Sequence, residues 1–341
     1  MRFLAMPLLA CSAVFAAPQA PVGPALERPA LVSRQPQRSV LLGAAQAGAR
    51  LVAVGERGIV LVSDDEGTRW EQVSVPVSVS LTAVRFADER HGWAVGHGGV
   101  VLHTQDGGRR WVRQFEGVAA ARALLEQAQK RGTGVSEAQR LVAEGADKPF
   151  FDVHFFDARR GIVVGAYNLA FATEDGGQTW QPMGDRLDNP KSLHLYAVRA
   201  RGNTVLIAGE QGLALRSDDG GKTFKRLATP YAGSYFTAEL PADGGVILAG
   251  LRGNVWHSRD GSAWTNAGTA MPVSFTASVS AGPDVLLANQ GGALFRLGAG
   301  GVEPLPTPPG APVTALLPLQ GNRLLVLGLR GASVLALGSK P

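Results

Sequence analysis

Short runs of apolar or alternating residues recur along the chain, and turn-forming residues separate them. In one well-formed stretch the runs are Thr82–Phe86, Gly92–Gly96, Val100–His103 and Trp111–Gln114. Runs of this length, bounded by Gly, Asp and Ser, are typical of β-strands joined by tight turns. Each such stretch therefore predicts a small antiparallel sheet of four strands.

A tetrapeptide rich in glycine follows the second run of each stretch and marks the repeat. Successive tetrapeptides begin 38 to 44 positions apart, apart from one interval of 69 positions that contains an insertion. We expect their glycines to supply the positive φ of a tight hairpin. The seven tetrapeptides begin at Gly55, Gly96, Gly165, Gly209, Gly250, Ala288 and Gly328.

A second signature, Ser/Thr-x-Asp-x-Gly-x-x-Trp or a close variant, follows the third run in five repeats. Its Ser/Thr and Asp side chains suit the backbone N–H groups of a turn, and its aromatic residue suits the gap between hairpins. We interpret this Asp-box as structural, because the spaced carboxylates and terminal Glu of an EF-hand calcium loop are missing. Its acidic and aromatic residues are Asp65 and Trp70, Asp106 and Trp111, Asp175 and Trp180, Asp219 and Phe224, and Asp260 and Trp264.

A period near 41 residues with four short strands per unit predicts an all-β fold, a seven-bladed β-propeller of four-stranded blades over residues 21–341. The seventh repeat has only three strands, and Pro29–Gln35 is expected to supply its fourth and so close the ring. The insertion, residues 117–148, predicts a small helical pair between blades two and three, over Ala119–Lys130 and Ser136–Glu144.

The first residues have the pattern of a signal peptide. Arg2 precedes an apolar stretch from Phe3 to Ala17 that ends in small residues. We assign residues 1–20 to this signal and expect an exported, periplasmic protein. Cys11, the only cysteine, stands in a Leu-Leu-Ala-Cys sequence that resembles a lipobox, so a lipoprotein anchored through Cys11 is an alternative to ordinary cleavage.

The formal net charge of +5 comes from 33 Lys+Arg and 28 Asp+Glu, without a basic block. Such a small excess does not predict nucleic-acid binding. No segment after the signal reaches the roughly 18 apolar residues of a membrane span. No nucleic-acid partner and no direct membrane span are therefore expected, and we expect a monomer.

The Gly92–Gly96 run, followed by the Asp-box that ends at Trp111, resembles the photosystem II stability/assembly factor-like family. Its members are propellers of Asp-box repeats, also called bacterial neuraminidase repeats, and the resemblance extends over residues 27–341. In photosynthetic organisms it implies a lumenal factor that binds a newly made membrane subunit, and non-photosynthetic bacteria carry similar proteins. We therefore expect a non-catalytic scaffold for binding or assembly of a membrane or envelope protein complex.

The alternative function is a secreted glycan-binding protein or a sialidase-like glycosidase, because those enzymes share the Asp-box. Their chemistry needs an arginine cluster, a Tyr nucleophile with a Glu, and an acidic proton donor. Sequence gives no such setting, so no catalytic residue and no cofactor are expected. His91, His97 and His103 are evenly spaced, but the strand assignment puts them at different heights of one blade, so no metal site is expected either.

The turns between second and third strands should share one face with the blade-to-blade connections, because strand direction alternates within each blade. The insertion 117–148 should lie on that face, and the Asp-boxes on the opposite one. A ring of polar and aromatic residues beside a helical pair is a candidate partner surface. Its predicted residues are Arg57, His97, Tyr167, Asn168, Glu210, Gln211, Arg252 and Arg330.

Overall fold

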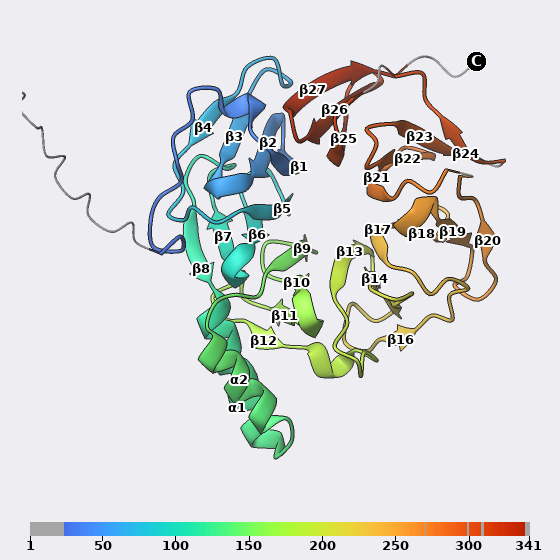
Figure 1. The fold of residues 1–341 in the computed structure, drawn as a ribbon. Coiled ribbons are helices and arrows are strands. Elements are labelled where there is room, and N and C mark those ends of the chain that lie inside the picture. Colours follow the sequence, from blue (N-terminus) through green and yellow to red (C-terminus); the bar gives the residue numbers. More distant parts are fainter. Residues whose placement is uncertain (1–23, 270, 299, 308–309, 338–341) are drawn as a thin grey trace, which may run out of the picture.

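The computed structural model describes residues 24–269, 271–298, 300–307 and 310–337, and it confirms the seven-bladed propeller (Figure 1). Six sheets have four strands each, and the last has three. Blades one to three are formed by β1 (Leu41–Ala47), β2 (Arg50–Gly55), β3 (Val60–Ser63) and β4 (Glu71–Val73); β5 (Leu81–Phe86), β6 (Gly92–Gly96), β7 (Val101–Thr104) and β8 (Val112–Phe115); and β9 (Phe150–Phe155), β10 (Gly161–Gly165), β11 (Ala170–Thr173) and β12 (Gln181–Pro182).

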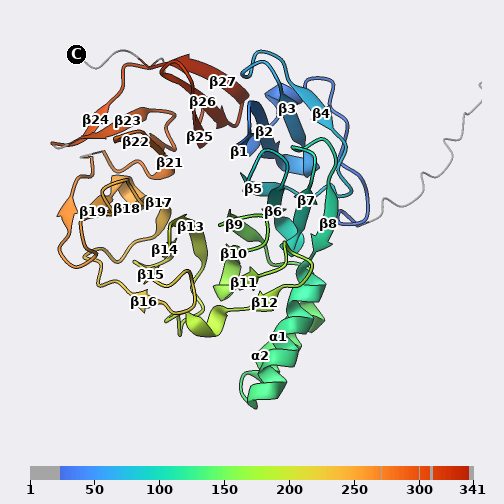
Figure 2. The same cartoon turned by 180° about the vertical axis from the view of Figure 1, so that it is seen from behind.

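The other four blades continue around the ring, which the view from behind also shows (Figure 2). Their strands are β13 (Leu195–Arg201), β14 (Thr204–Gly209), β15 (Ala214–Ser217) and β16 (Lys225–Arg226); β17 (Tyr235–Glu239), β18 (Val246–Gly250), β19 (Val255–Ser258) and β20 (Thr265–Asn266); β21 (Phe275–Ala281), β22 (Asp284–Asn289), β23 (Leu294–Gly298) and β24 (Gly301–Pro304); and β25 (Val313–Leu319), β26 (Arg323–Gly328) and β27 (Gly331–Ala336).

The core consists of separate apolar clusters, most of which join two neighbouring blades. Val52 and Val54 of blade one, for example, pack with Leu81 and Val84 of blade two. The same arrangement joins the last blade to the first, where Leu325 and Leu327 pack with Leu41 and Leu51. Because apolar burial is the main favourable term in folding, each blade depends on its neighbours for most of its stability.

The predicted closing strand is wrong. Residues 29–35 form no strand, and they lie against blade one instead of blade seven: Ala30 N–H donates to Val75 O at 3.0 Å, and Gln72 bonds to both Leu31 O and Ser33 N. These contacts are made by the Gln72 side chain and the Val75 carbonyl of blade one. The spacing of the repeats does not indicate them. The ring closes by side-chain packing, helped by the Thr314 hydroxyl, which donates to Leu41 O.

The Asp-boxes have the predicted geometry. In blade two the Asp106 carboxylate accepts hydrogen bonds from the Thr104 hydroxyl at 2.9 Å and from the N–H groups of Arg109 and Arg110 at 3.0 and 2.9 Å. Trp111 is 5% exposed and packs in the cluster between blades one and two. Each Asp-box therefore fixes a turn and places an aromatic residue against the preceding blade.

The insertion forms the predicted helical pair, here called the hairpin: α1 (Gly117–Arg131) and α2 (Val135–Glu144). The Glu116 carboxylate caps α1 by accepting from the N–H groups of Val118 and Ala119. In Figure 1 the hairpin projects from the ring beside blades two and three.

The predicted signal peptide, residues 1–20, and Cys11 lie outside the described residues. Within the described part of the chain, neither helix combines the length and apolar character needed to cross a membrane.

We predict that the Asp-box stabilises the fold and carries no activity of its own. Trp111→Ala should lower the free energy of unfolding by about 3–5 kcal/mol, because it empties a buried site between two blades. Asp106→Ala should cost about 1–3 kcal/mol, because it leaves turn N–H groups without their acceptor.

Urea unfolding and partner capture, measured side by side, test this role. Gln105→Ala, at an exposed position of the same turn, is the matched control and should change neither quantity. Normal stability together with lost capture in Asp106→Ala would contradict a purely structural Asp-box.

Candidate partner-binding surface and axial channel

The seven turns between second and third strands share one backbone contact. In every blade the residue after the second strand donates its N–H to the carbonyl that precedes the first strand, at 2.8 to 3.2 Å. This contact ties each turn to the connection that enters its blade, so turns and connections share one face, as expected; we call it the turn face. The donor and acceptor pairs are Glu56 and Val40, His97 and Ser80, Ala166 and Pro149, Glu210 and His194, Leu251 and Ser234, Gln290 and Ser274, and Leu329 and Pro312.

The first glycine of the tetrapeptides is needed for a different reason from the one predicted. Gly55, Gly96 and Gly165 are extended, with φ of −164°, −178° and −165°. A Cβ on these glycines would lie 2.1 to 2.2 Å from the carbonyl oxygen that the turn bonds to. Glycine avoids this clash at the three positions, whereas blade six makes the same turn contact with Asn289 in the equivalent place. The left-handed backbone occurs at later positions such as Arg57 and Tyr167, both with φ of 53°.

The predicted surface residues divide into two groups. Asn168 and Glu210 make internal hydrogen bonds: Asn168 Oδ1 accepts from Asn189 Nδ2 at 2.9 Å, and Glu210 accepts from His194 N–H at 3.0 Å. Their side chains therefore hold the turns together. The other predicted residues are exposed on the turn face: Arg57, His97, Tyr167, Gln211, Arg252 and Arg330.

The hairpin is fixed to the ring at its base. Ala120 and Ala121 of α1 are buried, and Ala120 packs in the cluster that joins blades two and three. Further out, Gln127 donates to Pro182 O at 3.3 Å, and Arg131 forms an ion pair with Asp185. These contacts hold the hairpin at one angle to blade three.

A groove of about 610 Å³ lies between the hairpin and the turn of blade three. Leu124 and Leu141 line it on the helical side, and Tyr167 and Leu169 on the propeller side. Tyr167 is 57% exposed, although it is a large aromatic residue. Charged residues of the hairpin and of blade three, such as Glu144 and Lys191, line the rest of the groove. A groove that combines apolar and charged side chains with an exposed aromatic residue suits a protein-binding surface.

Two neighbours orient the Tyr167 ring. The His194 ring stands edge-on to it, with 4.6 Å between centroids, and Lys148 Nζ lies 5.5 Å from its centroid. Its hydrogen bond to Asp147, and to a smaller extent the one to Glu144, raises the pKa of Lys148, so the ammonium group stays charged beside the ring. The groove therefore combines apolar side chains, an aromatic face and fixed charge.

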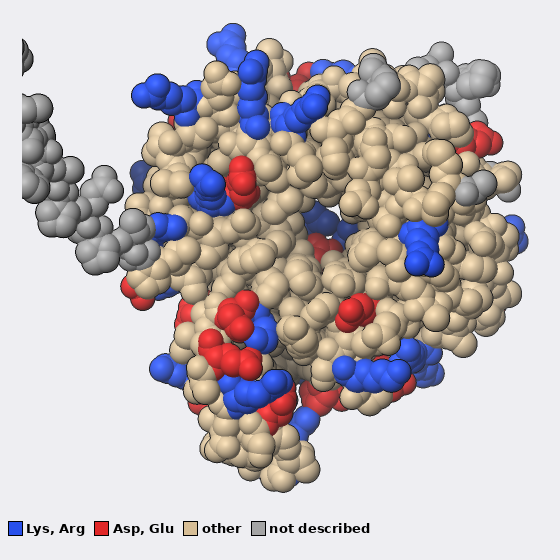
Figure 3. All heavy atoms as spheres, viewed as in Figure 1, with Lys and Arg blue, Asp and Glu red and all other residues tan. Residues whose placement is uncertain are grey.

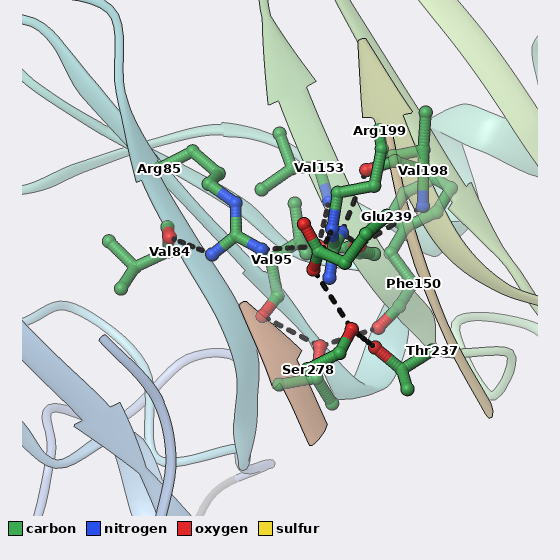
Figure 4. A network of polar contacts seen from close by, with 12 residues as sticks. Val84, Arg85, Val95, Phe150, Val153, Val198, Arg199, Thr237, Glu239 and Ser278 are labelled. Carbon is green, nitrogen blue, oxygen red and sulfur yellow. Dashed lines mark hydrogen bonds and ion pairs between the residues drawn. The ribbon is translucent and has the colours of Figure 1, made fainter. Parts of the chain in front are cut away.

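An axial channel of about 160 Å³ is lined by the first strands of all seven blades. Figure 3 shows charged side chains within the central opening. Asp152 of β9 is 5% exposed and pairs with Arg199 of β13, while Arg85 Nη2 of β5 lies 3.6 Å from its Oδ1. Arg199 Nε also lies 3.6 Å from Oε1 of Glu239, on β17 (Figure 4).

Hydroxyl groups complete this channel network. Ser278 and Ser280 of β21 each donate to the Glu239 carboxylate at 2.9 Å. Burial alone would raise the pKa of Asp152, but the charges of Arg199 and Arg85 and two backbone donors outweigh burial and lower it. Sequence reasoning missed this network. A charged residue at the fifth position of three first strands, Arg85, Arg199 and Glu239, was the available signal.

The three evenly spaced histidines do not converge on a metal position. His97 lies on the turn face, His91 pairs with Asp88, and the His103 ring stacks on Trp93 with 4.7 Å between centroids. Burial, with a smaller effect of the His91 charge, lowers the pKa of His103 to about 4. No group of three or more His, Cys, Asp or Glu in the described ranges is arranged to hold a metal ion.

The family model described as photosynthesis system II assembly factor YCF48 matches residues 46–127 and 134–265 of this chain. The chain belongs to this family. Over 98 residues it is 31% identical to the photosystem II assembly lipoprotein Ycf48 of Synechococcus sp. (strain CC9902). That alignment covers 29% of this chain and 27% of the relative, so it spans about a quarter of the relative's length.

Solved structures of family members share the fold. YCF48 bound to D1 peptide aligns with a TM-score of 0.67 at 16% identity, covering 92% of this chain and 100% of that one. YCF48 from Cyanidioschyzon merolae gives 0.64 at 17% identity, covering 88% and 96%. The GH74 xyloglucanase from Xanthomonas campestris, an enzyme, gives 0.59 at 14% identity, with 88% and 52% covered. Identities this low demonstrate a common fold alone.

We predict that Asp152 is a principal electrostatic support of the ring. Asp152→Asn keeps the shape but removes the ion pairs that Asp152 forms with Arg85 and Arg199, and only Glu239 then remains to balance the two buried guanidinium groups. Unfolding should therefore become about 3–5 kcal/mol easier at pH 7. Asp157→Asn, which removes an exposed pair with Arg160, is the control and should cost under about 1 kcal/mol.

The pH dependence of this effect follows from the lowered pKa of Asp152. A carboxylate with a depressed folded pKa stabilises the protein fully above its unfolded value, near 3.8, and progressively less as the pH falls through the folded value. The stability gap between wild type and Asp152→Asn should persist from pH 7 to about pH 5 and narrow below pH 4. A constant gap across this range in urea titrations would exclude the ionised carboxylate as its cause.

Proposed function

We propose that this chain is a non-catalytic, exported scaffold that binds a protein of a membrane or envelope complex during assembly. The observation that carries the proposal is the groove between hairpin and blade three, with Tyr167 exposed at its edge. Membership of an assembly-factor family supports it, as does a family structure described as bound to a peptide. The partner contacts the turn face, including Arg57, His97, Tyr167, Gln211, Arg252 and Arg330, where Asn168 and Glu210 keep the turns in place.

The absence of catalysis is part of this proposal. A glycosidase acid needs a carboxyl group that stays protonated until it meets substrate. Asp152 has the opposite character, since its pKa is lowered and its oxygens are bonded to arginine and backbone donors. Glu239 is likewise held by Arg199 and two serines. These carboxylates support a structural role for the channel.

Export to the periplasm is also proposed, on the signal-like pattern of residues 1–20. The name of the Synechococcus relative, a lipoprotein, supports lipid attachment at Cys11 as the form of membrane association. Incorporation of labelled fatty acid into wild type and Cys11→Ser distinguishes a lipoprotein from a protein released after cleavage.

The groove is tested by two variants, one on each of its walls. Tyr167→Asn removes the aromatic ring while retaining a residue that tolerates the left-handed backbone at this position. Replacing residues 119–146 by a short Gly/Ser link removes one wall. Each change should reduce crosslinked partner recovered from envelope membranes by at least tenfold, with little change in thermal unfolding for Tyr167→Asn.

Charge reversal tests the remainder of the face. Arg57→Glu with Arg330→Glu should weaken capture and make residual binding less sensitive to salt. The matched control is Arg109→Glu with Arg110→Glu, in an Asp-box turn on the opposite face. If the control abolished capture while the first pair had no effect, the partner would bind the Asp-box face and the proposal would fail.

A further inference from the structure

The last blade has an open edge. Blades one to six each have a fourth strand outside the third, whereas the sheet of blade seven is β25–β26–β27. In both views β27 lies at the rim of the ring, and no strand of the described residues lies outside it (Figures 1 and 2). The segment expected there, residues 29–35, is bonded to blade one.

The strand pairing shows which groups of β27 face outward. The residues of β27 alternate between two sets, Gly331, Ser333 and Leu335 in one and Ala332, Val334 and Ala336 in the other. The N–H of Leu337, which continues the first set by the same spacing of two, donates to Asn322 O at 2.8 Å. In an antiparallel pair such bonds fall on every second residue. The N–H and C=O groups of Ala332, Val334 and Ala336 therefore point away from β26, and among the described residues none of them has a hydrogen-bond partner outside the sheet.

Blades three to six show what this edge lacks. In each of them an apolar residue just after the fourth strand donates its N–H to a carbonyl at the start of the third strand, at 2.8 to 2.9 Å. The accepting carbonyl belongs to the first residue of the third strand that pairs with the second strand. Ala332, which pairs with Leu327 as Leu294 pairs with Ala288, is the equivalent residue of blade seven. The acceptor and donor pairs in the other blades are Ala170 and Met183, Ala214 and Leu227, Val255 and Ala267, and Leu294 and Leu305.

The sequence of β27 also differs from that of the other outer strands. Those strands are two to four residues long, and several carry residues that discourage further pairing, such as Lys225, Arg226 and Pro304. In contrast β27 has six residues, Gly-Ala-Ser-Val-Leu-Ala, with no charge and no proline. Proteins normally protect edge strands with charge, proline or short length, so an unprotected edge is suited to pairing with another chain.

A cavity of about 310 Å³ lies beside this edge, between blades six and seven. Leu294, Val313 and Leu335 line it, and Arg330 stands at its margin. Arg38 lies close by, since a Cβ on Gly331 would be 2.9 Å from Arg38 Cα. Both arginines are exposed, and neither forms an ion pair within the described part of the chain. Apolar space with two free cations fits an extended peptide that carries apolar and acidic residues.

We propose that the outer edge of β27 binds an extended acidic segment of a protein partner as the fourth strand of blade seven. An N–H of that segment donates to Ala332 O, an apolar side chain enters the cavity, and a carboxylate contacts Arg38 and Arg330. Strand addition of this kind takes its affinity from backbone hydrogen bonds and its specificity from side-chain pockets. The inference rests on the proposed scaffold function and names a second contact for its partner.

Amide hydrogen exchange followed by NMR tests the edge directly, with acetyl-Glu-Val-Glu-Leu-Glu-Val-amide as the probe. The amides of Ala332, Val334 and Ala336 should exchange freely in the protein alone and at least tenfold more slowly with saturating peptide. If they are already protected, because residues 29–35 or a second copy of the chain cover them, the proposal is overturned. Protection confined to other blades overturns it equally.

Variants separate strand pairing from charge. Ala336→Pro removes an outward N–H without removing a bond to β26, and should weaken peptide binding at least tenfold. Arg38→Glu with Arg330→Glu should do the same, while Arg226→Glu, at the outer strand of blade four, should not. A peptide with lysine in place of glutamate should bind at least tenfold more weakly. Equal binding of both peptides, or of all variants, would disprove an acid-selective edge.

The same assay distinguishes this proposal from the scaffold function. Tyr167→Asn alters the groove and should leave peptide binding at the edge unchanged. If the groove variants reduce capture of the membrane partner but the peptide fails to protect β27, only the edge proposal is wrong. If the peptide protects β27 while neither groove variant nor arginine reversal affects capture, the scaffold proposal is wrong and the edge has another use.

Discussion

The close backbone contact between each turn and the segment that enters its blade is the constraint on which the rest of the molecule depends. It lets the first strand of a blade run beside the axis while the third and fourth move outward, and it leaves no room for a Cβ at Gly55, Gly96 or Gly165. Because this contact recurs in all seven blades, the seven turns lie on one face although they differ in length. Side chains can then vary on that surface without altering the ring beneath it.

Two kinds of interaction hold the blades together around this frame. Between the blades the contacts are apolar, and they are repeated with small changes from seam to seam. Along the central channel the contacts between blades are polar, because the first strands converge there and leave too little space for a large apolar core. The network of Asp152, Arg199 and Glu239 spans three consecutive blades, so it links elements that the apolar clusters join only in pairs. Removing one charge therefore affects more than one seam.

The repeats made the architecture predictable from sequence. Blade number, the Asp-box geometry and the position of the hairpin all follow from local patterns at fixed spacing, and the structure has them as expected. The fourth strand of blade seven did not follow, because the position of residues 29–35 is decided by Gln72 and Val75, contacts distant in sequence that leave no periodic trace. The channel network was missed for a related reason. A single charged residue in an alternating strand, such as Arg85, is what a solvent-facing position of a sheet would also have. Only the recurrence of a charge at the same position of several first strands indicates that these residues face the central channel.

The way the ring closes bears on the order in which the protein is assembled. Contacts within a blade and between neighbours join residues a few tens of positions apart, whereas the hydrogen bond from Thr314 to Leu41 joins residues 273 positions apart. As the chain emerges into the compartment where it folds, the first six blades can pack in succession, but this seam waits for the last one. Until then blade one presents Leu41 and Leu51 uncovered to its surroundings. The newly made chain therefore passes through an open, C-shaped stage, and a chaperone that shields blade one would protect it during that interval.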